Sequence, residues 1–347
     1  MESTFSKSTY KATGEVIGKS LLTESVELKS ILNQARKSFL DWSNVSLLER
    51  KKYVVKICDY LSNNADYIAN LISKENGKTR VFALSGEVLS SLLSIEYYIK
   101  NCENFLSDDL LTPSTKLLAN KRSYIKRFPY GIIGIISPWN YPLSIPIVEL
   151  VKALLSGNVV ILKTSRETQM VGRFIEEAVV HSGLPNGVFS YINMSGKEVT
   201  KGLLNGGVDK LFFTGSVMVG KEIMKIASHT LTPVVLELGG NDSMIVCEDA
   251  EIELAARGAI WAGFSNCGQT CGGVERIYVN EKIYDRFLKF LSRLVVELRF
   301  GIDTDYNIDM GVMTTEKQVA IVSNHIEDAL KLGAKIYVQS EKKFLED

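Results

Sequence analysis

Apolar residues near the start of the chain recur every three or four positions, with charged residues between them: Leu28, Leu32, Ala35, Phe39 and Trp42. This spacing predicts an amphipathic helix. Residues 47–61, 65–74 and 80–105 repeat the pattern, with a break after the second of these at Asn76 and Gly77. We expect these helices to cover a core rather than to carry chemistry.

From residue 131 onward, short apolar runs alternate with helical segments. The runs predicted as buried strands are 131–137, 159–162, 188–192, 210–213, 234–238 and 244–246. Continuous apolar runs of this length are typical of parallel strands buried on both faces. Strands that alternate with helices predict an α/β fold built on a doubly wound parallel sheet.

The remaining segments suggest how the chain divides into domains. Polar residues 112–129 predict a projecting hairpin or edge strands. After residue 271 we expect a strand at 276–279, helices at 282–298 and 315–332, and a strand at 335–339. We predict a nucleotide-binding domain over residues 1–236, with a helical N-terminal region, and a second α/β domain over residues 237–347. The second domain has too few elements to close, so we expect it to be incomplete.

Composition excludes several classes of protein. Forty basic and forty acidic residues cancel, so no overall charge favours nucleic acid or an anionic membrane. The N-terminus, MESTFSKSTYK, lacks the apolar region of a secretory signal. Five cysteines without disulfide spacing suit a reducing cytoplasm. The three histidines are scattered and no Cys cluster surrounds them, so we predict no metal site.

One uncharged stretch, residues 128–148, is long enough to suggest a membrane span. It contains four of the seven prolines, Pro129, Pro138, Pro142 and Pro146. Because these prolines would break a spanning helix, we reject the span. A buried strand, a turn and a helix start fit the segment better.

Residues 263–276, GFSNCGQTCGGVER, surround Cys271 with small residues. A nucleophilic thiolate needs space around the sulfur and nearby N–H groups to hold the charge that it creates. Gly268, Gly272 and Gly273 provide that space. The alternative is a buried cysteine that acts as a small hydrophobe, as most free cysteines do.

Gly215 and Ser216 lie where a predicted strand meets a helix, in FFTGSVMVGKEI. Free N–H groups at the helix start favour a phosphate or pyrophosphate there. The segment matches most of GxxxxGK[ST], but Glu222 replaces the hydroxyl residue, so a nucleotide triphosphatase is disfavoured. Simple N-capping by Ser216 is the alternative.

Three further polar residues follow or end predicted strands. Lys163 ends a strand at the edge where open α/β sheets bind ligands; it is otherwise a solvated lysine. Asn140, in a proline-bracketed turn, could donate to an oxyanion or could satisfy its own turn. Glu237, in an apolar strand before two glycines, is expected to have a raised pKa and to act as a general base, or else to face solvent.

The order PWN, ILK, FTGS, ELGG and GQTC resembles the aldehyde dehydrogenase superfamily from about residue 24 to the end of the chain. The resemblance implies that Cys271 is the nucleophile, Glu237 the general base and Asn140, with the Cys271 N–H, the oxyanion donor. The reaction would oxidise a small-molecule aldehyde to a carboxylic acid through a thiohemiacetal and a thioester. Glu237 favours hydrolysis of that thioester over transfer to coenzyme A.

The resemblance also implies a site for NAD or NADP. Lys163 would bind the adenosine ribose, Gly215 and Ser216 the pyrophosphate, and Trp139 of PWN would also contact the cofactor. Arg166 stands where many NAD-preferring members have a glutamate. A guanidinium there would pair with the 2′-phosphate of NADP, so we expect NADP to be used at least as well as NAD.

Members of this family continue into an E-x-F-G-P segment and a C-terminal strand, which residues 272–347 do not match. We therefore expect a C-terminally truncated member with an incomplete catalytic domain. Homo-oligomerisation through the hairpin is implied by the resemblance. The alternative function is a non-catalytic nucleotide-binding remnant.

Overall fold

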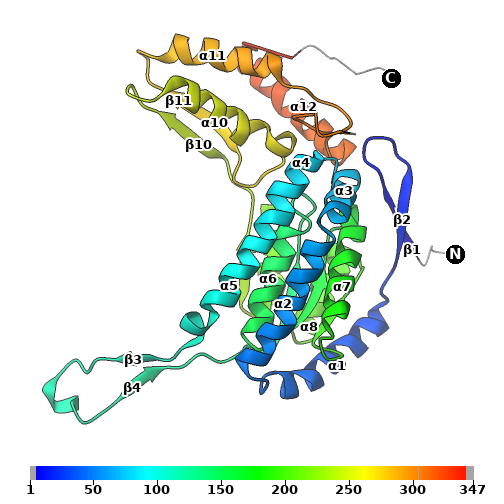
Figure 1. Cartoon of the computed structure of the whole chain (residues 1–347), viewed down its shortest axis with the longest axis vertical. Helices are drawn as coiled ribbons and strands as arrows, with labels where there is room; N and C mark the ends of the chain where they lie inside the picture. Colours follow the sequence, from blue (N-terminus) through cyan, green and yellow to red (C-terminus); the bar gives the residue numbers. More distant parts are fainter. Residues whose placement is uncertain (1–4, 304, 341–347) are drawn as a thin grey trace.

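The computed structural model describes residues 5–303 and 305–340, and its centre is a five-stranded sheet (Figure 1). The strands, in the order β7-β6-β5-β8-β9, are β7 (Phe189–Tyr191), β6 (Val159–Lys163), β5 (Ile132–Ile136), β8 (Lys210–Thr214) and β9 (Val234–Glu237). All neighbouring pairs are parallel, which confirms the predicted fold class. The strand order reverses between β5 and β8, where ligands bind at the carboxyl ends of such sheets.

Helices cover both faces of this sheet. One face carries α6 (Ser144–Leu155) and α7 (Gln169–Ser182), which pack beneath α2 (Leu47–Asn63), α3 (Ala65–Asn76) and α5 (Ser90–Leu106). The other carries α1 (Ser25–Trp42), α8 (Gly196–Asn205) and α9 (Val217–Ala227). Because both faces are covered, every residue of β5 and β6 is buried.

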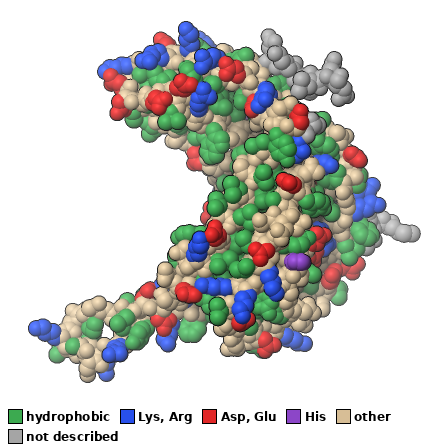
Figure 2. Space-filling view, in the orientation of Figure 1, with side chains coloured by type: hydrophobic (Ala, Val, Ile, Leu, Met, Phe, Trp, Pro, Cys, Tyr) green, Lys and Arg blue, Asp and Glu red, His purple; other side chains and the backbone are tan. Residues whose placement is uncertain are grey.

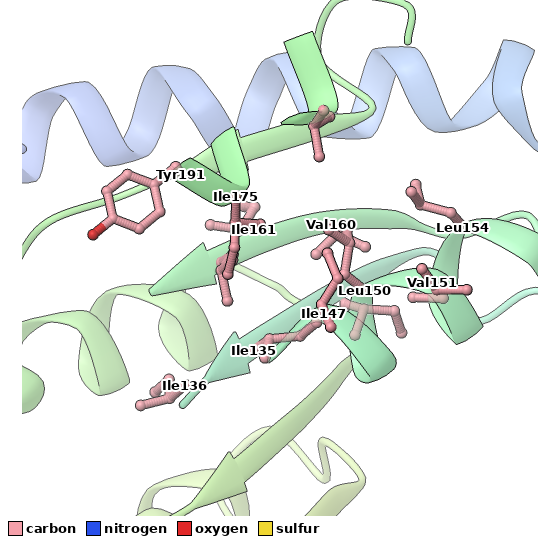
Figure 3. Packing of buried hydrophobic residues seen from close by; sticks show 14 of the residues in the cluster. Ile135, Ile136, Ile147, Leu150, Val151, Leu154, Val160, Ile161, Ile175 and Tyr191 are labelled. Atoms are coloured by element: carbon pink, nitrogen blue, oxygen red, sulfur yellow. The ribbon is translucent and has the colours of Figure 1, made fainter. Parts of the chain in front are cut away.

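Branched aliphatic side chains fill the space between β5, β6 and α6 (Figure 3). Ile135 and Val160 come from the strands, and Ile147, Leu150 and Val151 come from the helix at positions that share a face. Their burial fixes α6 on the sheet, so the turn between β5 and α6 is held at both of its ends.

The predicted hairpin forms and projects from the body of the molecule (Figure 1). β3 (Asp109–Leu111) and β4 (Ser123–Ile125) pair antiparallel, so the paired residues begin slightly before the predicted range. The residues between the two strands include a short 3₁₀ turn, Lys116–Leu118.

The pattern of apolar residues missed a second hairpin, β1 (Phe5–Thr9) with β2 (Val16–Leu21). Its buried side chains are serines, Ser6, Ser8 and Ser20, which bond to polar groups of distant segments. Alternation of apolar and polar residues therefore could not reveal it. The π-helix Ala83–Leu89, between α4 (Arg80–Phe82) and α5, was also not predicted.

Beyond β9, a two-stranded parallel sheet of β10 (Asp242–Val246) and β11 (Val274–Val279) packs on α10 (Ile252–Phe264) and α11 (Tyr284–Glu297). Val246 and Phe287 belong to its small separate core. The domain boundary at residues 236/237 remains a prediction. The helix predicted at 315–332 is α12 (Glu316–Lys331).

The strand predicted at residues 335–339 is wrong. In the described part of the chain, residues 334–340 form no regular element. A strand is defined by backbone hydrogen bonds to a neighbouring strand, and the short apolar run of residues 336–338 cannot supply that neighbour. Across the described ranges, no helix is long and apolar enough to cross a bilayer.

Candidate active site

The residues predicted to bind a cofactor or to react lie at one edge of the central sheet. They follow or end the parallel strands β5, β6, β8 and β9: Trp139, Asn140, Lys163, Gly215, Ser216 and Glu237. Parallel strands place their carboxyl ends at the same edge, so a common strand direction brings these separate motifs together.

Pairing of β10 with β11 brings the cysteine loop to this edge. Because the two strands are parallel and Asp242 pairs with Val274, the loops that precede them lie side by side. A Cβ on Gly240 would lie 3.3 Å from the carbonyl oxygen of Cys271. The segment that leaves Glu237 therefore meets the Cys271 loop, and Gly240 permits the close approach.

The two cysteines of the loop have opposite environments. Cys267 Sγ lies 3.5 Å from the carbonyl oxygen of Gly311 and donates to it, and burial raises its pKa to about 11. Cys271 is exposed. Since the thiolate is the nucleophile, Cys267 is held as an unreactive thiol and Cys271 is the accessible one.

The turn after β5 binds the cysteine loop through side chains. Asn140 Nδ2 donates to the carbonyl oxygen of Gln269 at 3.0 Å, and the Tyr141 hydroxyl lies 3.0 Å from Thr270 Oγ1. Asn140 Oδ1 accepts from the Tyr141 N–H at 3.1 Å. Asn140 is thus fixed against residues that immediately precede Cys271.

Glu237 is exposed, and the apolar surroundings expected around it are not formed. Leu236 and Leu238 pack towards Gly220 of α9, so alternation along the strand directs Glu237 to the opposite side. β9 is also an edge strand of the sheet. The Glu237 carbonyl oxygen accepts from the Gly215 N–H at 3.0 Å, which links the end of β9 to the loop of Gly215 and Ser216.

Lys163 provides a buried cation at the end of β6. It is 8% exposed, and desolvation lowers its pKa to about 8. At the end of the neighbouring strand β5, the buried Ser137 Oγ has no hydrogen-bond partner among the described residues. Sequence reasoning missed Ser137. Buried polar groups of this kind usually have partners, so they fit the hydroxyls or phosphate of a nucleotide.

Ser216 is the N-cap of α9, and its Oγ accepts from the Val219 N–H at 3.4 Å. The N–H groups of the first turn point beyond the helix and favour an anion there. Gly215 precedes the cap, and a Cβ on it would lie 2.6 Å from the Phe213 ring. A larger residue at position 215 would therefore require the Phe213 ring to move.

Arg166 is exposed in a 3₁₀ turn after β6, Arg166–Thr168. The neighbouring Glu167 pairs with Lys11 of the N-terminal hairpin at 2.7 Å. This ion pair engages the Glu167 carboxylate. The Arg166 guanidinium is thus accessible, whereas the Glu167 carboxylate is paired with Lys11.

A buried polar network that sequence reasoning missed surrounds the turn and the cysteine loop. Its members are all under 9% exposed: Asn76, Lys78, Glu87, Asn266, Gln269 and Thr314. The sequence signal was the polar run ENGK at the end of a helix, which we interpreted only as a break.

Asn266 and Cys267 also have positive φ, which is costly for residues other than glycine.

Figure 2 shows the molecule hollowed between the lobe with β10 and β11 and the projecting hairpin. A groove of about 730 Å³ lies between Phe82 on one side and Trp261 and Leu294 on the other. Cys271, Asn140 and Glu237 do not line it, so we assign it no role in the reaction.

Within the described ranges, no group of three or more His, Cys, Asp or Glu could hold a metal ion.

Comparison with known proteins supports one interpretation of this edge. A sequence profile of the aldehyde dehydrogenase family matches residues 2–347. The chain is 34% identical over 322 residues to a 4,4'-diapolycopene aldehyde oxidase of Methylomonas sp, covering 93% of this chain and 60% of that protein. It is 32% identical over 333 residues to the D-glyceraldehyde dehydrogenase (NADP(+)) of Picrophilus torridus, covering 95% and 66%.

Solved structures agree. An aldehyde dehydrogenase from Brucella melitensis biovar abortus 2308 superposes with a TM-score of 0.91 at 32% identity, over 96% of this chain and 68% of that one. The NAD+ complex of an aldehyde dehydrogenase from Bacillus cereus gives 0.89 at 27% identity, over 95% and 67%. The chain thus spans 60% and 66% of the lengths of the two curated relatives.

Proposed function

This chain belongs to the aldehyde dehydrogenase family, and we propose that it oxidises an aldehyde to a carboxylic acid with NAD or NADP. One observation carries the proposal. Asn140, the predicted oxyanion donor, is hydrogen-bonded at 3.0 Å to Gln269, two positions before the exposed Cys271. Two motifs far apart in the sequence thus meet with the chemistry that acyl transfer needs.

In the proposed reaction the Cys271 thiolate attacks the aldehyde carbon and the carbonyl oxygen becomes an oxyanion. The Asn140 amide carries two N–H groups. One donates to Gln269 and fixes the plane of the amide, and the other is available to the oxyanion together with the Cys271 N–H. Removal of one such donor typically costs about 10²- to 10³-fold in kcat.

When bound, NAD+ or NADP+ supplies the acceptor for the hydride that leaves the Cys271 adduct. The resulting thioester on Cys271 is then hydrolysed. Glu237 takes a proton from the attacking water, the acid is released and the Cys271 thiolate is restored. Gly240, three residues after Glu237, permits the close approach of this segment to the Cys271 loop.

The cofactor would be held at the carboxyl edge of the sheet. Lys163 and Ser137 supply buried donors for ribose hydroxyls, and the first turn of α9 after Ser216 suits a pyrophosphate. Trp139 adds an aromatic side chain beside this edge. The accessible Arg166 suits the 2′-phosphate of NADP, a cofactor that the Picrophilus torridus enzyme is named for.

The alternative, nucleotide binding without turnover, is favoured by a different observation. Cys271 and Glu237 are both exposed, whereas acyl-transfer sites normally exclude water. The two functions differ in whether hydride is transferred.

The deciding experiment measures NADH or NADPH formation by the purified 347-residue protein with aliphatic, aromatic and semialdehyde substrates. We expect turnover that Cys271→Ser abolishes and that Cys267→Ser retains, since Cys267 is buried and hydrogen-bonded to Gly311. Cofactor binding in a folded protein without turnover would contradict the proposal and support the alternative.

We also propose that the β3–β4 hairpin pairs with a second copy of the chain. Its strands expose Leu110, Tyr124 and Ile125, which a soluble monomer rarely displays together. Sedimentation should give a dimer or larger assembly for the native chain, and a smaller species for Leu110→Ser/Ile125→Ser. A monomeric native chain would disprove this role.

A further inference from the structure

We propose that the buried pair Lys78–Glu87 is a positioning device that orients Asn140 towards the oxyanion. Neither residue belongs to the motifs of the site, and neither lies at the reacting atoms. The inference rests on the proposed function, in which Asn140 is the oxyanion donor.

The pair holds both ends of the turn that carries Asn140. Lys78 Nζ donates to Glu87 Oε1 and, at 2.7 Å, to the carbonyl oxygen of Asn140. Glu87 Oε2 accepts from the N–H groups of Leu143 and Ser144 at 3.0 and 2.9 Å. Both side chains of the pair are fully buried. Residue 140 and the start of α6 are therefore tied to one rigid centre.

The same ammonium also contacts the neighbour of Asn140. Lys78 Nζ lies 4.3 Å from the centroid of the Tyr141 ring, a favourable cation–π distance. The Tyr141 hydroxyl in turn meets Thr270, and the Tyr141 N–H donates to Asn140 Oδ1. The orientation of the Asn140 amide thus depends on where Tyr141 is held, and Lys78 holds it.

Stability alone does not explain a buried ion pair here. Well-packed apolar residues often match or exceed the stabilisation from a buried pair, because both charges must leave water. What this pair adds is orientation of the turn, since Lys78 donates to the Asn140 carbonyl oxygen and one Glu87 oxygen accepts from two backbone N–H groups at the start of α6. Glu87 also lies in the π-helix Ala83–Leu89, and such helices occur frequently at functional sites.

Glu75 provides a matched control within the chain. It is also fully buried, and its carboxylate accepts from Met170 N–H at 2.8 Å and Val171 N–H at 2.9 Å, at the start of α7. It therefore does for α7 what Glu87 does for α6, but it makes no hydrogen bond to the turn with Asn140. A purely structural role would make the two carboxylates equivalent.

The test compares Lys78→Met/Glu87→Gln with Glu75→Gln. The double replacement removes both charges together, so it leaves no unpaired buried charge. We expect kcat to fall roughly 10- to 100-fold, with the KM for aldehyde and the Kd for cofactor little changed, and Glu75→Gln to keep its kcat. Equal losses of kcat in the two variants would overturn the proposal.

A double-mutant cycle with Asn140→Ala gives a second readout. If the pair acts through Asn140, replacing it in the Asn140→Ala background should cost less than about 3-fold more, because interacting residues are not additive. If the double replacement lowers kcat by the same factor in the Asn140→Ala variant as in the native protein, the pair does not act through Asn140.

Hydrogen exchange separates this proposal from the proposed function, because it needs no turnover. The Tyr141 amide reports the Asn140 side chain directly, and it should lose protection in Lys78→Met/Glu87→Gln but not in Glu75→Gln. Unchanged Tyr141 protection would overturn the positioning role whether or not the native chain oxidises aldehydes. If the double variant does not fold, Glu87→Gln alone should show a smaller loss in the same direction.

Discussion

Two buried lysines illustrate how surroundings decide the role of a residue type. Lys78 meets a buried carboxylate, a carbonyl and an aromatic ring, all within the protein. Desolvation lowers the pKa of both lysines, but Glu87 opposes this shift at Lys78, whereas at Lys163 desolvation acts alone and lowers the pKa to about 8. A buried cation with partners inside the protein stabilises the structure around it, whereas a buried cation without a charged partner is suited to bind an anionic or polar ligand.

The pKa of Lys163 predicts how cofactor binding depends on pH. Its folded pKa of about 8 lies below the ordinary 10.5, so the ammonium is present below pH 8 and is lost as the pH rises through that value. We expect the Kd for NADP to rise by up to about tenfold per pH unit above 8. Fluorescence titrations from pH 6.5 to 9.5 measure this. The Lys163→Met variant should bind weakly and show no such rise; a flat profile in the native protein would contradict the assignment.

Arg166 predicts cofactor preference. We expect Arg166→Glu to weaken NADP binding relative to NAD by roughly 10- to 100-fold, because a charged hydrogen bond to phosphate is replaced by repulsion. Kd values for both cofactors measure the ratio. Glu167→Gln, which releases only the pair with Lys11, is the control and should leave the ratio nearly unchanged. A native preference for NAD would sink the prediction.

At the scale of elements, buried carboxylates join helices that are distant in sequence. Glu75, at the end of α3, accepts from the first N–H groups of α7 and from Ser8 of β1. One side chain thereby caps α7 and anchors the N-terminal hairpin. Glu87 likewise caps α6 by accepting from the N–H groups of Leu143 and Ser144. The starts of α6 and α7 are thus capped by acids on other elements, whereas α9 is capped locally by Ser216.

Glu75 predicts how stability depends on pH. Desolvation raises its pKa from 4.5 to about 7, so its stabilising contribution is complete below pH 4.5 and is lost as the pH rises through 7. The corresponding loss of unfolding free energy between those values is on the order of 3 kcal/mol. Urea unfolding at pH 5, 6, 7 and 8 should show a flatter profile for Glu75→Gln than for the native chain. Parallel profiles would show that Glu75 does not titrate in this range.

At the scale of the molecule, hydrogen bonds from residues 312–314 join the end of α3 to the cysteine loop. Gly77 O accepts from Val312 N–H at 2.8 Å, and Thr314 bonds both to Asn76 O, at 2.6 Å, and to Gln269 Oε1, at 3.1 Å. The cysteine loop is thus fixed to both lobes, and its geometry depends on how closely they meet.

Gly311 tests this contact. A Cβ there would lie 1.9 Å from the Gly77 carbonyl oxygen, so Gly311→Ala must push two backbones apart. We expect it to lower the unfolding free energy by about 1–3 kcal/mol and to reduce kcat. Gly258→Ala in α10, where a Cβ meets open space, is the control and should be neutral or stabilising by up to about 1 kcal/mol. Urea unfolding measures both, and equal effects would exclude a tight contact between the lobes.

Local patterns along the chain were sufficient to predict several helices and strands and the order of the reactive motifs. Continuous apolar runs and period-3.6 apolar spacing depend only on residues close together in the sequence, so the strands β5 and β6 and the amphipathic α12 were predictable. Tertiary structure alone decided which polar groups find partners. The serine-rich hairpin, the unpaired residues 335–339, the exposed face of Glu237 and the Lys78–Glu87 pair all depend on what a distant segment offers. A hydrogen bond or ion pair needs its partner placed to within fractions of an ångström, and apolar spacing along the chain carries no information about that placement.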